Sequence, residues 1–221
     1  SVSEAISHIV NGFPFKDGDV VVSLNNEYPS NVLPWMLNEK RKDFKLVLLD
    51  AKDFQSLDTL NQKLPPKTRV VNISHVKFNT GERVDLIKTG KFLKDREIFF
   101  IVDGSQSLGG LPVSKDELKY IDVFAAATYK WMLGPYGHAF SYFTPMAQKR
   151  VERTHANWMV SPKSQTSGSL VDYSLDTLPG ARKFDRGQSP NMVAMALLEG
   201  GLELINEMGI DVIETHNQRL I

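Results

Sequence analysis

A chain of 221 residues, 42% of them hydrophobic, is long enough to bury a large core. Its 26 basic and 26 acidic residues cancel, so no net field favours nucleic acid or an anionic membrane, and we expect neither as a partner. The chain has no membrane-length apolar run, no secretory leader pattern and no cysteine. These absences favour a cytoplasmic protein and exclude a disulfide framework or a thiolate metal site within this segment.

Short apolar runs rich in β-branched and aromatic residues alternate along the chain with longer amphipathic stretches. The predicted strands span residues 20–24, 46–49, 70–73, 98–102, 123–127 and 139–143. The predicted helices span residues 3–11, 30–42, 56–64, 86–93, 146–153, 190–208 and 211–221. This alternation is typical of βαβ units and predicts an α/β fold, a three-layer αβα sandwich with a mainly parallel mixed sheet.

Two features depart from the alternation. Residues 157–187 are rich in Ser, Thr, Gly and Pro and have weak periodicity, which predicts a long ordered excursion of the kind that often carries function. Residue 1 falls at a helix start and residues 216–221 resemble the middle of a helix. We therefore expect residues 1–221 to be one domain of a longer protein, without its N-terminal segment and a C-terminal small domain.

Three segments follow predicted strands, where an open parallel sheet binds its ligands. Asp103 follows the strand at 98–102, Lys130 follows the strand at 123–127, and residues 26–31 follow the strand at 20–24. Taken singly, such an acid is usually a turn residue, such a lysine a solvated charge, and an aromatic such as Tyr28 a packing residue. Together, the acid and the lysine place an anion and an amine at one edge of the sheet.

Five segments in this order resemble the class V aminotransferase family, a group of fold type I enzymes that depend on pyridoxal 5'-phosphate (PLP). They are residues 27–35 with Glu-Tyr-Pro-Ser-Asn and Pro-Trp, 74–81 with Ser-His-Val and Thr-Gly, 101–109 with Asp-Gly-Ser-Gln, 122–137 with Thr-Tyr-Lys-Trp and Gly-Pro-Tyr-Gly, and 182–187 with Arg-Lys-Phe-Asp-Arg-Gly. The resemblance covers essentially the whole chain.

The resemblance implies a role for each of four residues around a PLP ring. Lys130 would form the Schiff base with the cofactor and then act as general base and acid at the substrate α-carbon. Asp103 would pair with the pyridine nitrogen and keep it protonated, so that the ring accepts electrons. Gln106 would bond the phenolic oxygen of the ring, and Tyr28 would lie over its face.

The resemblance also implies how a chain without net charge holds the phosphate. Backbone N–H groups at a helix start favour an anion, and hydroxyl groups add donors. Gln188 and Ser189 would reach the phosphate of a partner subunit across a dimer interface, so the resemblance predicts a homodimer. The residues expected at the phosphate are Val2, Ser3, Thr128, Tyr129, Gln188 and Ser189.

The resemblance implies an enzyme that breaks a bond at the α-carbon of an amino acid, with transamination as the default outcome. The alternatives are a cysteine desulfurase or selenocysteine lyase, an epimerase, a kynureninase-like lyase, and a relative that binds PLP without turnover. Desulfurases of the family usually carry His at the positions of Tyr28 and Tyr129 and Asn at that of Phe78, so these residues favour the other branches.

Other candidate chemistry has less support in the sequence. His75 follows the strand at 70–73 and is a candidate acid or base, although a histidine there is more often bonded to a backbone carbonyl. The remaining histidines lack metal-ligand spacing, so no metal site is expected. No phosphate loop and no dinucleotide-binding glycine pattern follows a strand, which argues against a nucleotide cofactor.

Overall fold

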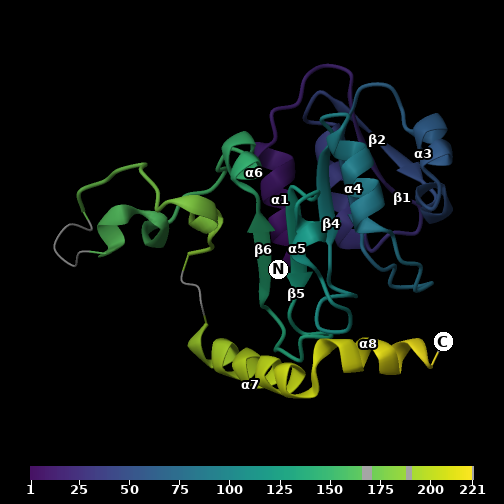
Figure 1. Cartoon of the computed structure of the whole chain (residues 1–221). Helices are drawn as coiled ribbons and strands as arrows, with labels where there is room; N and C mark the ends of the chain where they lie inside the picture. Colours follow the sequence, from purple (N-terminus) through teal and green to yellow (C-terminus); the bar gives the residue numbers. More distant parts are fainter. Residues whose placement is uncertain (166–170, 188–190, 221) are drawn as a thin grey trace.

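The computed structural model of the protein describes residues 1–165, 171–187 and 191–220. Its centre is a six-stranded sheet in the order β2-β1-β3-β4-β5-β6 (Figure 1). β1 to β5 run parallel, and β6 is antiparallel to β5, which confirms the predicted mainly parallel mixed sheet. The strands are β1 (Asp19–Leu24), β2 (Phe44–Leu49), β3 (Thr68–Ser74), β4 (Phe99–Asp103), β5 (Val123–Ala127) and β6 (Ala139–Phe143).

Helices follow most of the strands. The α-helices are α1 (Val2–Gly12), α2 (Leu33–Glu39), α3 (Leu57–Lys63), α4 (Leu86–Lys94), α5 (Lys115–Leu118), α6 (Pro145–Arg150), α7 (Met192–Met208) and α8 (Ile210–Gln218). Short 3-10 helices lie at Pro29–Asn31, Ala51–Phe54, Trp158–Val160, Pro162–Gln165 and Gly180–Phe184. Within the described part of the chain, no helix combines the length and the apolarity that crossing a bilayer requires.

The sheet is buried on both faces, which gives the three layers predicted from the alternation of elements. On one face, Leu60 of α3 and Leu93 of α4 pack against side chains such as Val71 of β3. On the other face, Ile6 of α1 and Trp35 of α2 belong to a second cluster, together with residues of all five parallel strands, including Phe44 of β2. Strands buried on both sides read as continuous apolar runs, which is why their positions were visible in the sequence.

The segment predicted as one helix over residues 30–42 is two shorter elements. A 3-10 helix over Pro29–Asn31 comes first, and α2 begins only at Leu33. Pro34 lacks a backbone N–H and is therefore tolerated in the first turn of a helix but not in its interior. The break brings Asn31 to the carboxyl edge of the sheet, and Trp35 packs in the core.

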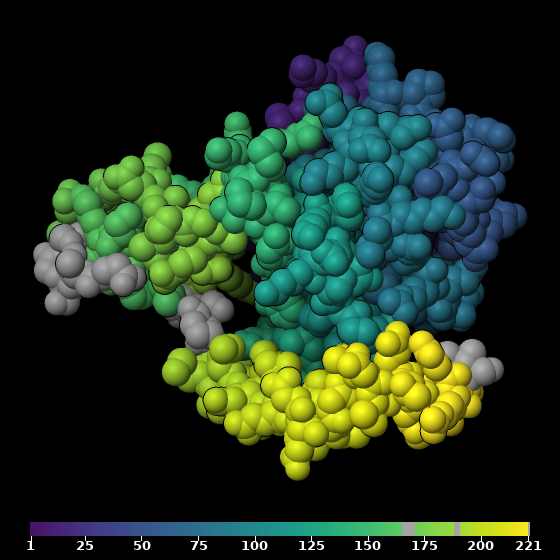
Figure 2. Space-filling model, viewed as in Figure 1, coloured from purple at the N-terminus to yellow at the C-terminus, as the bar shows by residue number. Residues whose placement is uncertain are grey.

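α7 and α8 lie along the carboxyl edge of the parallel strands (Figures 1 and 2). α7 approaches the loop after β5 at Gly201, where an added Cβ would lie 2.7 Å from the Met132 carbonyl oxygen. In α8, Glu214 pairs with Arg83 at 3.2 Å. The predicted excursion, residues 157–187, contributes 3-10 helices to a lobe beside the sheet (Figure 1).

Candidate active site

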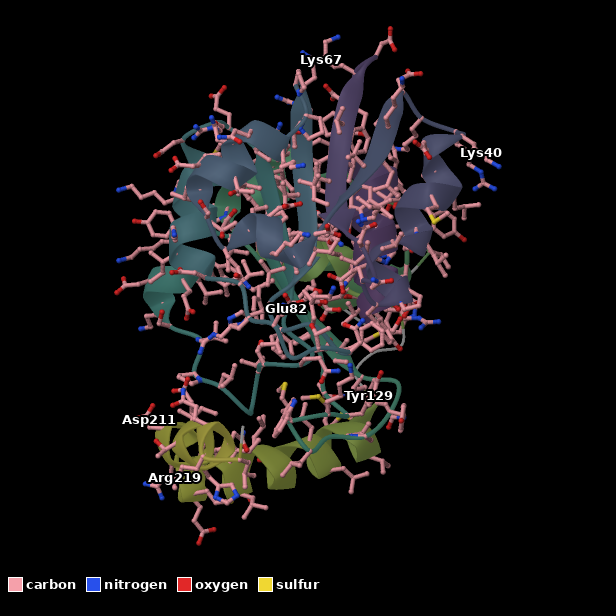
Figure 3. All side chains as sticks on the ribbon, turned by 90° about the vertical axis from the view of Figure 1, so that its right-hand side faces the viewer. Lys40, Lys67, Glu82, Tyr129, Asp211 and Arg219 are labelled. Carbon is pink, nitrogen blue, oxygen red and sulfur yellow. The ribbon has the colours of Figure 1, made fainter. Side chains whose placement is uncertain are left out.

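The two residues predicted to carry the chemistry lie at the ends of neighbouring strands. Asp103 is the last residue of β4 and pairs in register with Ala125 of β5, and Lys130 follows β5 by three residues. A cavity of about 110 Å³ opens at this edge, and both residues line it. Figure 3 shows Tyr129 at this end of the sheet, beside α7, and Lys67 at the opposite end. The structure thus brings the predicted acid and amine to one site.

Asp103 is a buried carboxylate held by two donors from different elements. Its Oδ1 accepts a hydrogen bond from the Ser105 backbone N–H at 2.8 Å, and its Oδ2 accepts one from Asn31 Nδ2 at 3.0 Å. Burial raises the pKa of Asp103, the two donors oppose this effect, and the nearby Glu27 carboxylate adds to it. Since no cation pairs with Asp103 among the described residues, the site holds an acidic group ready for a positively charged partner.

Lys130 presents its amine to the cavity among aromatic rings. Its Nζ lies 5.1 Å from the ring centre of Tyr28 and 6.0 Å from that of Tyr129. Over the described part of the chain it has no carboxylate within ion-pair distance. The loop that follows turns back at Gly134, whose N–H donates to the Thr128 carbonyl at 2.8 Å. An amine without a salt bridge is free to react with a carbonyl carbon.

Aromatic side chains form the mouth of the site. Tyr28 and Tyr129 line the cavity, Tyr129 stacks on Tyr136 with ring centres 4.2 Å apart, and Tyr28 meets Phe78 edge to face at 5.5 Å. Burial and then the neighbouring Tyr28 raise the pKa of Tyr129, so its hydroxyl stays protonated as a donor at neutral pH.

The start of α1 supplies the remaining polar wall. Val2 and Ser3 line the cavity at the helix N-terminus, where the first backbone N–H groups have no acceptor within the helix. Ser3 Oγ donates to Ser30 Oγ at 2.7 Å, and Ser30 also lines the cavity. N–H groups and hydroxyls around a positive helix end favour a bound anion.

The structure does not bring every predicted residue to the cavity. Gln106 is not among the residues that line it, and His75 is not either. The Thr128 hydroxyl donates to the carbonyls of Pro135 and His138 at 3.3 and 3.2 Å, so it holds the following turn. Gln188 and Ser189 lie outside the described residues.

His75 is buried on the side of Arg83. Its ring Nε2 accepts a hydrogen bond from Arg83 Nε at 3.2 Å, so its partner is a side chain and not the backbone carbonyl expected for such a histidine. Burial, and then the Arg83 charge, lower the pKa of His75 to about 4. The ring is therefore neutral at physiological pH.

Several lining residues were missed by sequence reasoning. Ser30 and Ser105 stand inside the segments singled out after strands, but as small polar residues they carry no pattern that assigns them a role. Gly137 and His138 directly precede β6 and reach the cavity because β6 returns beside β5. The lining residues not predicted as site residues are Ser1, Ser30, Ser105, Ala127, Gly137 and His138.

These groups fit one kind of ligand. A buried carboxylate suits a protonated ring nitrogen, a free amine suits an aldehyde, and a helix start with hydroxyls suits a phosphate. PLP carries these three features together. The fit rests on the chemistry of Asp103, Lys130 and the α1 start, all of which line one cavity.

Comparison with known families gives a match over the full chain. The family model described as Aminotransferase class-V matches residues 1–221. Two curated relatives named probable cysteine desulfurase, from Methanothermobacter thermautotrophicus and Pyrococcus abyssi, are each 28% identical over the whole of this chain. The alignments cover 53% and 54% of those relatives, so this chain spans about half of their length.

Solved structures agree with the fold. The apo cysteine desulfurase from Thermococcus onnurineus NA1 superimposes with a TM-score of 0.84 and 25% identity, over 99% of this chain and 54% of that one. A variant of C-DES with glycine covalently linked to its PLP cofactor gives a TM-score of 0.83 at 22% identity, over 94% of this chain and 54% of that one. At that identity the second likeness concerns the fold.

Proposed function

Because this chain belongs to the class V aminotransferase family, whose members depend on PLP, we propose that it holds the cofactor of an enzyme acting at the α-carbon of an amino acid. The family match confirms the resemblance given by the five motifs, and the fold is that of the fold type I PLP enzymes. The observation that carries the proposal is the meeting at one cavity of a buried carboxylate, Asp103, and the amine of Lys130, which has no salt bridge to any described residue.

The residues divide the work between holding the ring and moving a proton. When bound, PLP supplies an electron sink that stabilises negative charge at the α-carbon of a substrate. Asp103 pairs with the ring nitrogen and keeps it charged, because a charge-assisted hydrogen bond in a buried site is stronger than a neutral one. Lys130 would hold the cofactor through its amine and would move a proton at the α-carbon of the substrate.

The start of α1 is the proposed phosphate site. Val2 and Ser3 provide backbone N–H groups, and Ser3 and Tyr129, which carry hydroxyls, line the same cavity. Tyr28 contributes an aromatic face beside the Lys130 amine. Gln106, Thr128, Gln188 and Ser189 stay predictions that rest on the resemblance alone, as does the homodimer.

The leading reaction is removal of sulfur from cysteine or a related amino acid. Curated relatives named cysteine desulfurase support it, among them CsdA of Escherichia coli at 23% identity. Transamination, the default predicted from the motifs, is the second candidate. Tyr28, Tyr129 and Phe78 favour it, because they stand where desulfurases of the family usually carry His, His and Asn.

The two reactions release different products. With L-cysteine and a thiol reductant, desulfuration gives alanine and sulfide, whereas transamination gives a 2-oxo acid from an amino donor and an amino acid from the acceptor. We expect sulfide and alanine in equal amounts from the PLP-loaded full-length protein. Oxo-acid formation without sulfide would establish the second candidate, and neither product with any of the twenty amino acids would contradict both.

A further inference from the structure

The Asp103 carboxylate belongs to a buried polar chain that crosses from β4 to the loop after β1. Asn31 Nδ2 donates both to Asp103 Oδ2 at 3.0 Å and to Ser74 Oγ at 3.1 Å. Ser74 Oγ in turn donates to Glu27 Oε1 at 2.6 Å. Glu27, Asn31, Ser74 and Asp103 are each less than 10% exposed, so water does not compete for these bonds.

Charge dictates the orientation of the Asn31 amide. Two carboxylates, Asp103 and Glu27, stand at the ends of the chain and can only accept when ionised. The nitrogen of the amide must therefore face Asp103, and its second N–H must face Ser74, whose own O–H donates a hydrogen bond to Glu27. The backbone of Asn31 is also held in place, because its carbonyl accepts a hydrogen bond from Asn72 Nδ2 at 3.0 Å.

Glu27 is anchored independently of Asp103. Its Oε2 accepts from the Ser74 backbone N–H at 2.8 Å, and its Oε1 accepts from the Tyr28 backbone N–H at 2.7 Å. Tyr28 lines the cavity, so the same carboxylate that ends the polar chain also sets the backbone position of the ring over the site.

Asn31 and Glu27 act on the ionisation of Asp103 in opposite directions. A donor such as Asn31 stabilises the ionised form of a carboxylate, whereas a nearby negative charge such as Glu27 destabilises it. Separately, the Asn31 and Ser105 donors engage one oxygen each, which fixes the plane of the carboxylate.

We propose that Asn31 is a positioning residue that orients the Asp103 carboxylate toward the cofactor ring and keeps it ionised, and that Glu27 opposes this ionisation from the far end of the chain. This inference deepens the proposed function and rests on it for the identity of the ring. Neither residue contacts the amine of Lys130, so both act through Asp103.

The first test measures PLP affinity against pH. Asn31→Leu removes the donor and keeps the approximate shape of the side chain. The loss of one hydrogen bond to a charged group predicts roughly tenfold weaker PLP binding at neutral pH. The loss should grow as the pH falls, because the unsupported carboxylate takes up its proton at higher pH. Asn38→Leu is the matched control, since Asn38 is equally buried but donates only to the Pro34 carbonyl.

A merely structural role for Asn31 gives a different result. The positioning role would be wrong if Asn31→Leu weakened PLP binding by the same factor at every pH. It would also be wrong if Asn38→Leu weakened PLP binding at low pH as much as Asn31→Leu does. Other titratable groups face the same cavity and are common to all variants, so their contribution cancels in the comparison. They are Tyr28, Tyr129, Lys130 and His138.

The second test needs no cofactor. The titration of Asp103 is followed by ¹³C NMR in protein labelled at aspartate carboxyl carbons, with the Asp103 signal identified by its loss in Asp103→Asn. We expect the titration midpoint to move to higher pH in Asn31→Leu and to lower pH in Glu27→Gln. Glu27→Gln keeps the test open if Asn31→Leu does not fold.

The outcomes separate the inference from the proposed function. Unchanged midpoints in both variants would overturn the inference even if the protein binds PLP. Opposite shifts in a protein that never binds PLP would support the inference about Asp103 and overturn the proposed cofactor.

Discussion

Burial of the Asp103 carboxylate makes the stability of the protein depend on pH. Its carboxylate is buried without a cation in the described chain, and burial raises its pKa. A carboxyl group with a raised folded-state pKa binds more protons when folded than when unfolded. Its contribution to stability is therefore present at low pH and is lost as the pH rises through the folded-state pKa, so the cofactor-free protein is less stable above that pKa than below it.

Asp103→Asn removes the buried carboxylate, but its amide turns one of the two acceptor oxygens into a donor that faces the N–H of Asn31 or Ser105, so the free energy of unfolding of the cofactor-free protein should change by less than about 1 kcal/mol at neutral pH. It should also lower turnover by about a hundredfold, as expected when a charged group in an active site is lost. Chemical unfolding and turnover measurements on the same preparations check both effects. Asp122→Asn is the matched control, since burial also raises the pKa of Asp122 but its carboxylate accepts from Phe100 N–H away from the cavity.

His75 predicts a second pH dependence, with the opposite sign. Its pKa is about 4 in the folded protein, against 6.5 for an ordinary histidine. Below pH 6.5 the unfolded chain takes up a proton that the folded protein refuses, so stability falls as the pH falls toward 4. The full loss amounts to about 3 kcal/mol from the difference between the two pKa values.

The measurement is the free energy of unfolding in urea between pH 4 and 7. His75→Gln should flatten this part of the profile, because the amide oxygen can still accept from Arg83 but does not titrate. A slope that survives the substitution would assign the acid sensitivity to other groups.

At the scale of elements, α7 is held against the loop after β5 by the absence of a side chain. An added Cβ on Gly201 would lie 2.7 Å from the Met132 carbonyl oxygen and 3.0 Å from that of Leu133. Such contacts force α7 away from the loop that carries Lys130. A Cβ added to the adjacent Gly200 would meet no atom within 4 Å. The two glycines therefore form a matched pair on one helix.

Gly201→Ala should destabilise the protein by about 1–3 kcal/mol through overpacking. Gly200→Ala should stabilise it by up to about 1 kcal/mol, because alanine favours the helix more than glycine does. Thermal unfolding of both variants checks the pair. Equal effects of the two substitutions would mean that α7 does not pack on this loop.

Elements differed in how well the sequence predicted them. β1, β4 and β5 lie where apolar runs indicated, because a strand buried on both faces leaves a continuous signal. β6 also lies where it was predicted, although alternate residues of this edge strand are exposed or partly exposed. α5, with four residues, is too short for its periodicity to stand out. The split at residues 29–39 followed from Pro29 and Pro34, whose effect on the helix was not taken into account.

The site was predictable in its chemistry but not in its support. Asp103 and Lys130 were singled out because each lies within three residues of the end of a predicted strand and matches a motif. Asn31 and Ser105 were not assigned roles, because their bonds depend on geometry that spacing does not contain. The contact between Asn31 and Asp103 joins residues 72 positions apart, and only the folded sheet brings them together.

At the scale of the whole molecule, a chain with no net charge concentrates opposite partial charges at one edge of its sheet. The positive end of α1 and the Lys130 amine lie on the same cavity as the Asp103 carboxylate. This chain covers about half the length of its curated relatives. The product assay described above therefore uses the full-length protein.

The most direct test of the account is to find where the cofactor attaches. The full-length protein is loaded with PLP, reduced with borohydride, digested and analysed by peptide mass spectrometry. We expect a pyridoxyl phosphate adduct on Lys130 of the wild-type protein and no adduct on the corresponding peptide of Lys130→Ala. An adduct on another lysine, or none on the loaded wild-type protein, would contradict it.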